Sequence, residues 1–187
     1  MMDYLELILA WILYLALHSF LASTWMKSKI PISARWYRLL YSIIATIGLL
    51  GLVYLMALIP PVWVYALTPF LKFAGMVAAS WGVIIVVASF RQISMKAFLG
   101  LKKENNKELV KTGLHSSVRH PIYSGTILIM VGMFASVPSL TVLLTALVIF
   151  AYLPIGVYFE EKKLIDVFGQ EYLDYKENVK AIIPGVL

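Results

Sequence analysis

Five apolar runs of near-membrane length alternate with short polar stretches along this chain of 187 residues. A bilayer core offers the backbone no water to bond with, so an apolar run of about 20 residues crosses it as an α-helix. The mean hydropathy of +0.85 agrees with an integral membrane protein. We therefore expect an all-α fold, a polytopic membrane helical bundle with about five transmembrane helices. The expected spans are Tyr4–Trp25, Tyr37–Ile59, Phe70–Phe90, Pro121–Ser136 and Leu140–Phe159.

The fourth run is shorter than the others and contains Gly125 and Gly132, so it is expected to form a tilted or re-entrant hairpin with the fifth. The polar tail that follows has helical periodicity. One face carries Glu161, Leu164, Phe168, Tyr172 and Tyr175, and Gly169 interrupts the pattern. The tail is thus predicted to form an amphipathic helix, broken at Gly169, that lies on the membrane surface or folds against the preceding loop.

The basic residues predict the orientation of the bundle. Of 16 lysines and arginines, 15 lie in the first loop, in the 91–119 stretch or in the tail, and Lys72 is the exception. Positive residues collect on the cytoplasmic side of membrane proteins, so we expect the N-terminus outside and the C-terminus in the cytoplasm. Because these charges flank apolar runs, the net charge of +6 indicates anionic lipid rather than nucleic acid.

The length suits one compact membrane domain, residues 1–187, with a three-helix part over 1–90 and a cofactor-binding part over 91–187. The absence of cysteine excludes disulfides, thiolate metal sites and a cysteine nucleophile. No cluster of metal ligands is apparent. Nothing in the sequence demands an obligatory protein partner.

The sequence Arg119-His120-Pro121 stands directly before the fourth run. Proline favours the first turn of a helix, and the free N–H groups of that turn, together with the arginine charge, favour an anion. Tyr123 adds a hydroxyl, and Gly125 leaves room for a close approach. An equally plausible interpretation is that Arg119 and Tyr123 only anchor the helix at the lipid headgroups.

Two further polar pairs adjoin apolar runs. Glu160-Glu161 ends the fifth run and offers carboxylates to a cationic group, although Lys162 and Lys163 would neutralise them at a plain solvated helix end. His18-Ser19 lies inside the first run, where polar residues usually face the bundle. An interhelical hydrogen bond explains His18 at least as well as catalysis does. An anion site and a cation site on the same side of the membrane together suit a zwitterion, such as an amino acid moiety.

Two ordered blocks, "ELVKTGLHSSVRHPIYSG" and "EEKKLIDVFGQEYLDYKENVKAIIP", resemble the integral membrane methyltransferases. This family includes the isoprenylcysteine carboxyl methyltransferases and the phospholipid methyltransferases. The resemblance covers about residues 108–184. It implies S-adenosylmethionine as cofactor, in a pocket closed by the C-terminal segment, and an acceptor that arrives from the bilayer between helices. This cofactor contains an amino acid zwitterion, which agrees with the paired anion and cation sites.

The resemblance and the local chemistry together give the candidate site. The candidate catalytic residues are Arg119, His120, Tyr123 and His18. The candidate cofactor-binding residues are Leu109, Val110, Gly113, Leu114, His120, Pro121, Tyr123, Glu160 and Glu161. Glu160 or Glu161 is expected to bind the ammonium group of the cofactor, and Arg119 or His120 its carboxylate. No metal is expected.

The N-terminal half, with "LALHSFLAS" and "RWYRLLYSIIA", resembles bacterial methanethiol S-methyltransferases and denitrification-associated membrane proteins. The expected function is methyl transfer to a membrane lipid, another lipophilic molecule, or a small thiol or carboxylate, in a bacterial or archaeal cell membrane. We expect a lateral opening where Gly125 and Gly132 thin the wall of the fourth span. The alternatives are an NADPH-dependent enzyme similar to membrane sterol reductases, which share an Arg-His-Pro-x-Tyr-like block, and a non-catalytic accessory protein.

Overall fold

The computed structural model describes residues 3–91, 101 and 108–185, so the charged stretch before Glu108 lies largely outside the described residues. Apart from one isolated bridge between Trp63 and Ser139, the regular elements in these residues are helices. They are α1 (Tyr4–Ala22), α2 (Thr24–Lys29), α3 (Ala34–Leu58), α4 (Pro69–Ser89), η1 (Gly113–Ser116), α6 (Pro121–Ser136), α7 (Leu140–Phe168) and α8 (Gln170–Asn178).

Polar side chains mark the starts of the long helices. Asp3 accepts from the Glu6 backbone while the Glu6 side chain accepts from that of Asp3, which forms a complete capping box on α1. Ser33, Thr68 and Ser139 accept from the first turns of α3, α4 and α7. Such bonds satisfy N–H groups that have no partner within the helix, so each boundary is determined locally.

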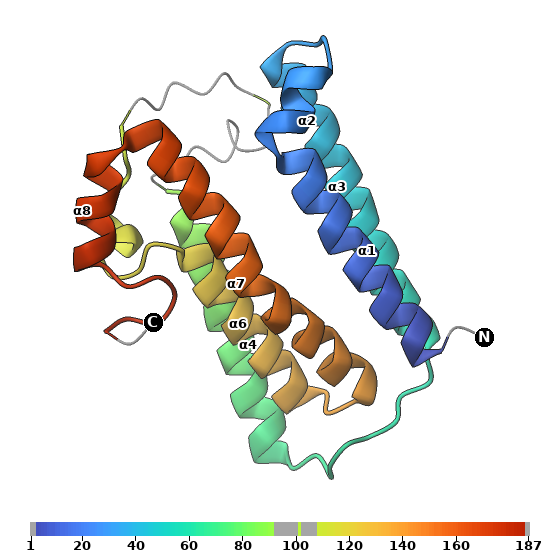
Figure 1. Ribbon diagram of the computed structural model, residues 1–187. Coiled ribbons are helices and arrows are strands. Elements are labelled where there is room, and N and C mark those ends of the chain that lie inside the picture. The colour runs from blue at the N-terminus through green and yellow to red at the C-terminus, as the bar shows by residue number, and fades with distance from the viewer. Residues whose placement is uncertain (1–2, 92–100, 102–107, 186–187) are drawn as a thin grey trace.

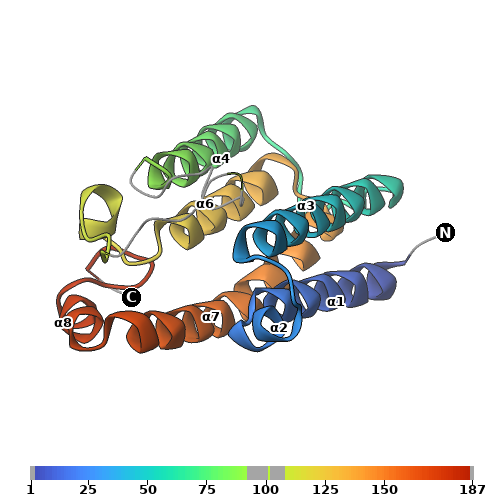
Figure 2. The same cartoon turned by 90° about the horizontal axis from the view of Figure 1, so that it is seen from above.

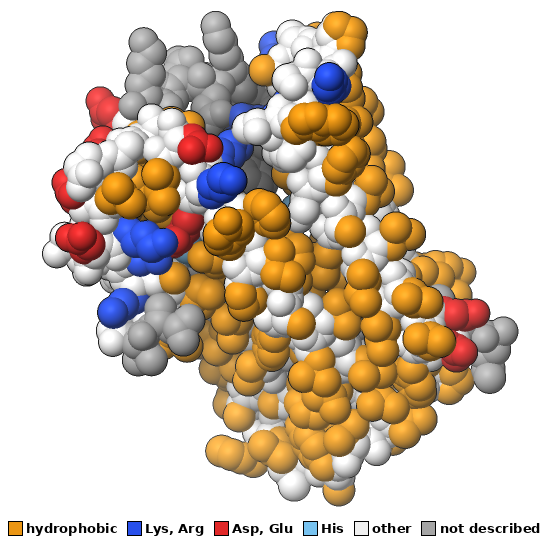
Figure 3. Space-filling view, viewed as in Figure 1, with side chains coloured by type: hydrophobic (Ala, Val, Ile, Leu, Met, Phe, Trp, Pro, Cys, Tyr) orange, Lys and Arg blue, Asp and Glu red, His pale blue; other side chains and the backbone are white. Residues whose placement is uncertain are grey.

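The five expected runs all appear as helices. Among the described residues, α1, α3, α4 and α7 are long and apolar enough to cross a membrane. The fourth run forms α6, which has 16 residues, or about 24 Å of helix against a hydrocarbon core of about 30 Å. Figure 3 shows apolar side chains covering most of the visible face, with charged side chains gathered over α8 and the adjoining end of α7. We call that end of the molecule the charged end.

The helices form two groups (Figure 1). The pair α1 and α3 stands beside a group in which α6 lies next to α4, and α7 lies between this group and α1 (Figure 2). The two groups are joined through a buried apolar cluster that draws on α1, α3 and α7. Its members are Leu7, Trp11, Leu52, Ile59, Ile149 and Leu153.

Glycines bring α4 and α6 into backbone contact. A Cβ atom added to Gly132 would lie 2.6 Å from the Gly75 carbonyl oxygen, and one added to Gly125 would lie 2.7 Å from the Gly82 carbonyl oxygen. Small residues permit such close approach between membrane helices, where dispersion contacts replace the hydrophobic effect as the driving force. The expectation that Gly125 and Gly132 thin a wall beside a lateral opening is therefore wrong: both are buried against α4.

The last long helix also extends further than expected. Instead of ending at Phe159, α7 continues past Pro154 and through both glutamates to Phe168. Gly169 then takes a positive φ of 56°, which only glycine adopts at little cost, and α8 turns back toward the start of α6. The predicted break at Gly169 is confirmed. Tyr172 and Tyr175 on α8 are buried, so this helix folds against the protein.

We predict that Gly132→Ala lowers the free energy of unfolding by about 1–3 kcal/mol, because the added methyl group has no space against the backbone of α4. The measurement is denaturant unfolding in detergent micelles. Gly51→Ala on α3 is the matched control, since a Cβ there would meet nothing within 4 Å. Equal stability of the two variants would contradict the close packing of α4 and α6.

Candidate active site

The start of α6 pairs with the C-terminal segment at the charged end. The Arg119 N–H donates to the Lys180 carbonyl and the His120 N–H to the Ala181 carbonyl, each at 2.8 Å. The Ser124 hydroxyl donates to the Ile182 carbonyl. Pro121 occupies the first turn of α6 and has no N–H to satisfy. Three successive residues after α8 thus close over the first turn of α6.

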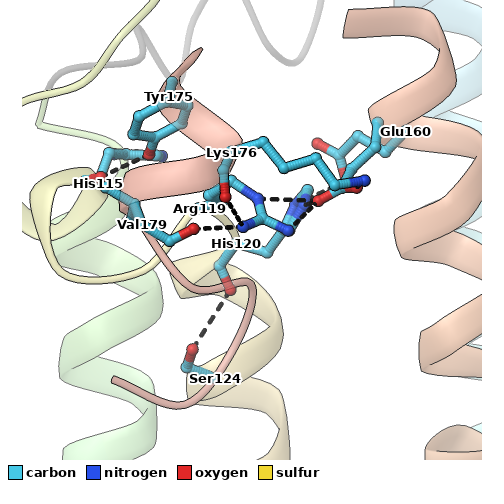
Figure 4. Close-up of polar contacts among 9 residues, drawn as sticks. His115, Arg119, His120, Ser124, Glu160, Tyr175, Lys176 and Val179 are labelled. Atoms are coloured by element: carbon cyan, nitrogen blue, oxygen red, sulfur yellow. Dashed lines mark hydrogen bonds and ion pairs between the residues drawn. The ribbon is translucent and has the colours of Figure 1, made fainter. Parts of the chain in front are cut away.

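The Arg119 side chain holds this arrangement together (Figure 4). Its Nε and Nη2 donate to Oε1 of Glu161 at 2.9 and 2.6 Å, and its Nη1 donates to the carbonyls of Lys176 and Val179. A planar guanidinium suits this purpose, because it presents several donors in a fixed geometry. These bonds engage the Arg119 guanidinium, which was one of the two groups expected to bind a ligand carboxylate. Binding a ligand there would require Arg119 to give up one of them, so the catalytic role of Arg119 stays a prediction.

The two adjacent glutamates have different surroundings, since neighbouring residues on a helix point about 100° apart. The Glu161 side chain is 7% exposed and bonds to Arg119 and, through Oε2, to the Lys176 ammonium at 2.5 Å. The Glu160 side chain is 49% exposed, and its carboxylate lies 3.5 Å from Nδ1 of His120. Neither carboxylate forms an ion pair with Lys162 or Lys163 among the described residues. Glu161 is therefore a structural anchor, and Glu160 is the carboxylate open to a ligand.

Three further ionisable side chains lie near Glu160. His120 is buried, and the Tyr123 ring stacks on it with centroids 5.5 Å apart. The Tyr123 hydroxyl interacts with the Glu160 carboxylate. His115 on η1 lies within electrostatic range of both His120 and Glu160. A carboxylate, two imidazoles and a phenol thus converge at the charged end of the bundle.

His115 was not among the candidate site residues, yet its setting is unusual. The side chain is buried, and its Nδ1 has no hydrogen-bond partner within the described residues. Burial lowers the pKa of His115, and the neighbouring His120 lowers it further. A neutral buried nitrogen without a partner costs free energy unless a ligand satisfies it. The sequence signal was a histidine two residues after Gly113, which alone does not reveal burial.

A tyrosine from α8 fixes the position of His115. The Tyr175 hydroxyl donates to the His115 carbonyl, and burial raises the pKa of Tyr175 to about 12. The phenol therefore remains protonated at neutral pH and keeps its role as donor. In this way the same helix that supplies Lys176 also positions η1.

The remaining predicted residues lie before α6. Gly113 has a φ of 60° at the start of η1, which fits the turn expected there. Leu109, Val110 and Leu114 are half-buried, and Pro121 is buried. They form the chain that leads into His115 and His120, and their contact with a cofactor stays a prediction.

His18 lies apart from these residues, on α1. Its ring is half-buried, and the Tyr41 hydroxyl of α3 lies 3.0 Å from Nε2 and 3.3 Å from Nδ1. The adjacent Ser19 hydroxyl bonds to the Tyr152 hydroxyl of α7. The interhelical hydrogen bond expected as one explanation of His18 is therefore present.

Comparison with known proteins agrees with the resemblance seen in the sequence. The sequence model of the phospholipid methyltransferase family matches residues 70–171, which is more than half of the chain. This protein belongs to the phospholipid methyltransferase family. The match spans nearly all of α4 and the whole of α6 and α7, and so includes Arg119, His120 and both glutamates.

Several curated relatives of this family member carry methyltransferase names. The chain is 44% identical over 73 residues to methanethiol S-methyltransferase 1 of Bradyrhizobium diazoefficiens, covering 38% of this chain and 24% of that protein. It is 36% identical over 86 residues to protein-S-isoprenylcysteine O-methyltransferase of Saccharomyces cerevisiae, covering 46% and 36%. It is 32% identical over 125 residues to methanethiol S-methyltransferase of Crocosphaera subtropica, covering 61% and 47%.

The chain spans about a quarter to a half of the length of these relatives. No solved structure gives a significant match. The family is therefore established by sequence, whereas the geometry of the site rests on the contacts among α6, α7, α8 and η1.

We predict that Glu161→Gln releases the C-terminal segment from α6, because Arg119 and Lys176 lose the carboxylate that holds them. Removing one partner of a buried ion pair costs about 3–5 kcal/mol. Hydrogen exchange at the Arg119 and His120 amides, which donate to this segment, should accelerate at least about tenfold, since about 1.4 kcal/mol is a factor of ten.

Glu160→Gln is the matched control for this experiment, since its carboxylate is half exposed and lies outside the Arg119 bonds. It should leave exchange at both amides nearly unchanged. Equal effects of the two substitutions would contradict the division of roles between the glutamates.

Proposed function

We propose that this protein is a membrane methyltransferase that uses S-adenosylmethionine. The observation that carries the proposal is Glu160, a half-exposed carboxylate at the charged end that contacts His120 and Tyr123. His115, whose buried Nδ1 has no partner within the described residues, lies within electrostatic range. Family membership and the names of the relatives support the same activity.

The described residues fit this cofactor chemically. Glu160 would bind its ammonium group, and Nδ1 of His115, which has no partner within the described residues, would bind a carboxylate or ring acceptor. Both ring nitrogens of His120 already lie near glutamate oxygens, Nδ1 near Glu160 and Nε2 at 3.3 Å from Glu161. The half-buried Leu109, Val110 and Leu114 offer apolar contact to an adenine. When bound, the cofactor supplies an electrophilic methyl group. The protein contributes orientation and exclusion of water, and needs no metal or covalent intermediate for that task.

The competing reductase interpretation fits the charges less well. A nicotinamide dinucleotide carries phosphates, which require cationic partners. The open charged group beside the histidines is instead a carboxylate, and Arg119 is bonded to Glu161. A non-catalytic role does not account for the convergence of a carboxylate, two imidazoles and a phenol at the charged end. We therefore favour methyl transfer over both alternatives.

The acceptor and the orientation follow from the surroundings of the site. The charged end contains most basic residues of the described chain, so we propose that it faces the cytoplasm, with the N-terminus outside, in a bacterial or archaeal cell membrane. The acceptor would then be a lipophilic molecule or a small thiol or carboxylate that reaches the site from the membrane. No further protein is needed to complete the described site.

We predict that S-adenosylhomocysteine binds the purified protein in detergent, measured by isothermal titration calorimetry. Glu160→Gln should weaken this binding by about 1.5–3 kcal/mol, the contribution of a charge-assisted hydrogen bond. Glu177→Gln, the same change on the exposed face of α8, is the control and should bind as the wild type does. Absence of binding by the wild-type protein would refute the proposed function. Unchanged affinity of Glu160→Gln would remove Glu160 from the site.

A further inference from the structure

A second polar group lies inside the bundle, on the side of α1 and α3. It consists of His18 and Ser19 on α1, Tyr41 on α3 and Tyr152 on α7, and we call it the His18 cluster. Tyr14 lies beside it, with its ring 5.9 Å from that of His18. Polar groups cost free energy within a membrane, and an ionisable one there usually serves a function. A hydroxyl side chain at position 18 could also bond to Tyr41, so joining the helices does not by itself require a histidine there.

The His18 cluster adjoins the Glu160 site through Tyr123. A Cβ atom added to Gly156 on α7 would lie 3.1 Å from the Tyr123 hydroxyl and 3.3 Å from the Tyr152 ring, so the two tyrosines flank the same glycine. Tyr123 also bonds to Glu160 and lies in the neighbourhood of Tyr152 and Tyr41. Tyr123 thus lies between Glu160, where the methyl donor is proposed to bind, and the His18 cluster. We call the place around Glu160 the donor site.

The other faces of α6 are already covered. Its α4 face is closed by backbone contacts at Gly125 and Gly132, and its first turn is covered by the C-terminal segment. An acceptor for a methyl group held at Glu160 and His120 would therefore approach from the α1 and α3 side of Tyr123, where the Tyr123 ring packs against the apolar cluster of α1, α3 and α7. This direction leads to the His18 cluster.

The hydrogen bonding of His18 leaves a ring nitrogen for a ligand. Tyr41 lies within reach of both nitrogens, but one hydroxyl bonds well to only one of them at a time. When the Tyr41 oxygen accepts a hydrogen bond from the N–H of one nitrogen, it orients the ring, and the second nitrogen of the neutral imidazole keeps the lone pair that can accept a proton. A positioned imidazole is a common general base.

Resting on the proposed function, we propose that His18 is the general base that deprotonates a small thiol acceptor, and that Tyr41 positions it. As the acceptor sulfur bonds to the methyl carbon, the bond from that carbon to the donor sulfonium breaks, and its electron pair goes to the donor sulfur. The thiol proton passes to His18. The products are a methyl thioether, the neutral donor thioether and an imidazolium, which returns its proton to solvent.

The chemistry of the acceptor follows from the need for a base. A carboxylate acceptor is already ionised at neutral pH, needs no base and would be repelled by Glu160. A thiol is neutral and moderately apolar, so it can enter between membrane helices, but it reacts as the thiolate. A base next to its binding site therefore favours the thiol over the carboxylate.

The test compares wild type with His18→Gln, which can still bond to Tyr41, using ethanethiol as acceptor and S-adenosylmethionine as donor. At pH 7 the kcat of His18→Gln should fall by about 10²–10⁴-fold, the usual contribution of a general base. Wild-type kcat should rise with pH and then level off. That of His18→Gln should keep rising about tenfold per pH unit, because thiolate must then form in solution.

The titratable groups around His18 do not ionise in the pH range of this kcat profile. Within the described residues they are phenols: Tyr14 on α1, Tyr41 on α3 and Tyr152 on α7. Phenols generally titrate near pH 10. The histidines of the donor site are present in both proteins, so the difference between the two profiles reports His18.

Two further variants test the positioning role. Tyr41→Phe should lower kcat about tenfold with little change in KM, since it removes one orienting hydrogen bond. Tyr54→Phe makes the same change on the exposed face of α3 and should behave as wild type. If His18→Gln does not fold, Tyr41→Phe still decides: a kcat equal to that of Tyr54→Phe would overturn the proposal.

Binding measurements separate this proposal from the proposed function. Ethanethiol should bind protein saturated with S-adenosylhomocysteine, and His18→Gln should weaken that binding about tenfold without changing the affinity for S-adenosylhomocysteine. A wild-type protein that binds S-adenosylhomocysteine but methylates no ethanethiol overturns the role of His18 and leaves the proposed function standing. If His18→Gln kept the kcat and the pH profile of the wild type, the role of His18 would likewise be overturned.

Discussion

The buried ion pair between Arg119 and Glu161 is the interaction on which the charged end of this protein depends. It links the residue before α6 to the far end of α7, and through the carbonyls of Lys176 and Val179 it also fixes α8 and the chain that follows. Both side chains are less than a tenth exposed. Charges removed from water in this way require complete pairing, and the Lys176 ammonium supplies the second partner. Because this pair is satisfied internally, the neighbouring Glu160 is left as the open carboxylate.

Packing in the apolar part determines which side of the site stays accessible. The glycine contacts bring α4 and α6 together without intervening side chains, so nothing can pass between them. The apolar cluster joins α1 and α3 to α7 and includes Trp11 and Leu153. The His18 cluster lies nearer the charged end, where α7 supplies Tyr152 instead of an apolar side chain. A rigid wall on one side of α6 and a polar group on the other give the site a donor side and an acceptor side.

The local features of this fold could be predicted from sequence, whereas the contacts between distant segments could not. Five apolar runs, the proline before α6 and the helix break at Gly169 follow from period and backbone chemistry. The spacing of seven residues between Gly125 and Gly132 was visible, but not that α4 would pack there. Glu160 and Glu161 looked equivalent because the lysine that distinguishes them comes from α8, which folds back after Gly169. His115 was missed for a similar reason, since Tyr175, which bonds to its carbonyl, comes from α8, 60 residues further along the chain.

The division between a structural Glu161 and an open Glu160 is tested most directly by a double-mutant cycle on Arg119 and Glu161. The free energy of unfolding is measured in micelles for Arg119→Gln, Glu161→Gln, the double variant and the wild type. Each single variant leaves a buried charge without its partner, so each should be strongly destabilised. The double variant should be about as stable as either single one, so the coupling free energy should equal the loss in one single variant, about 3 kcal/mol or more. Additive losses in the double variant would show that the two side chains act independently, and would contradict the central role of their ion pair.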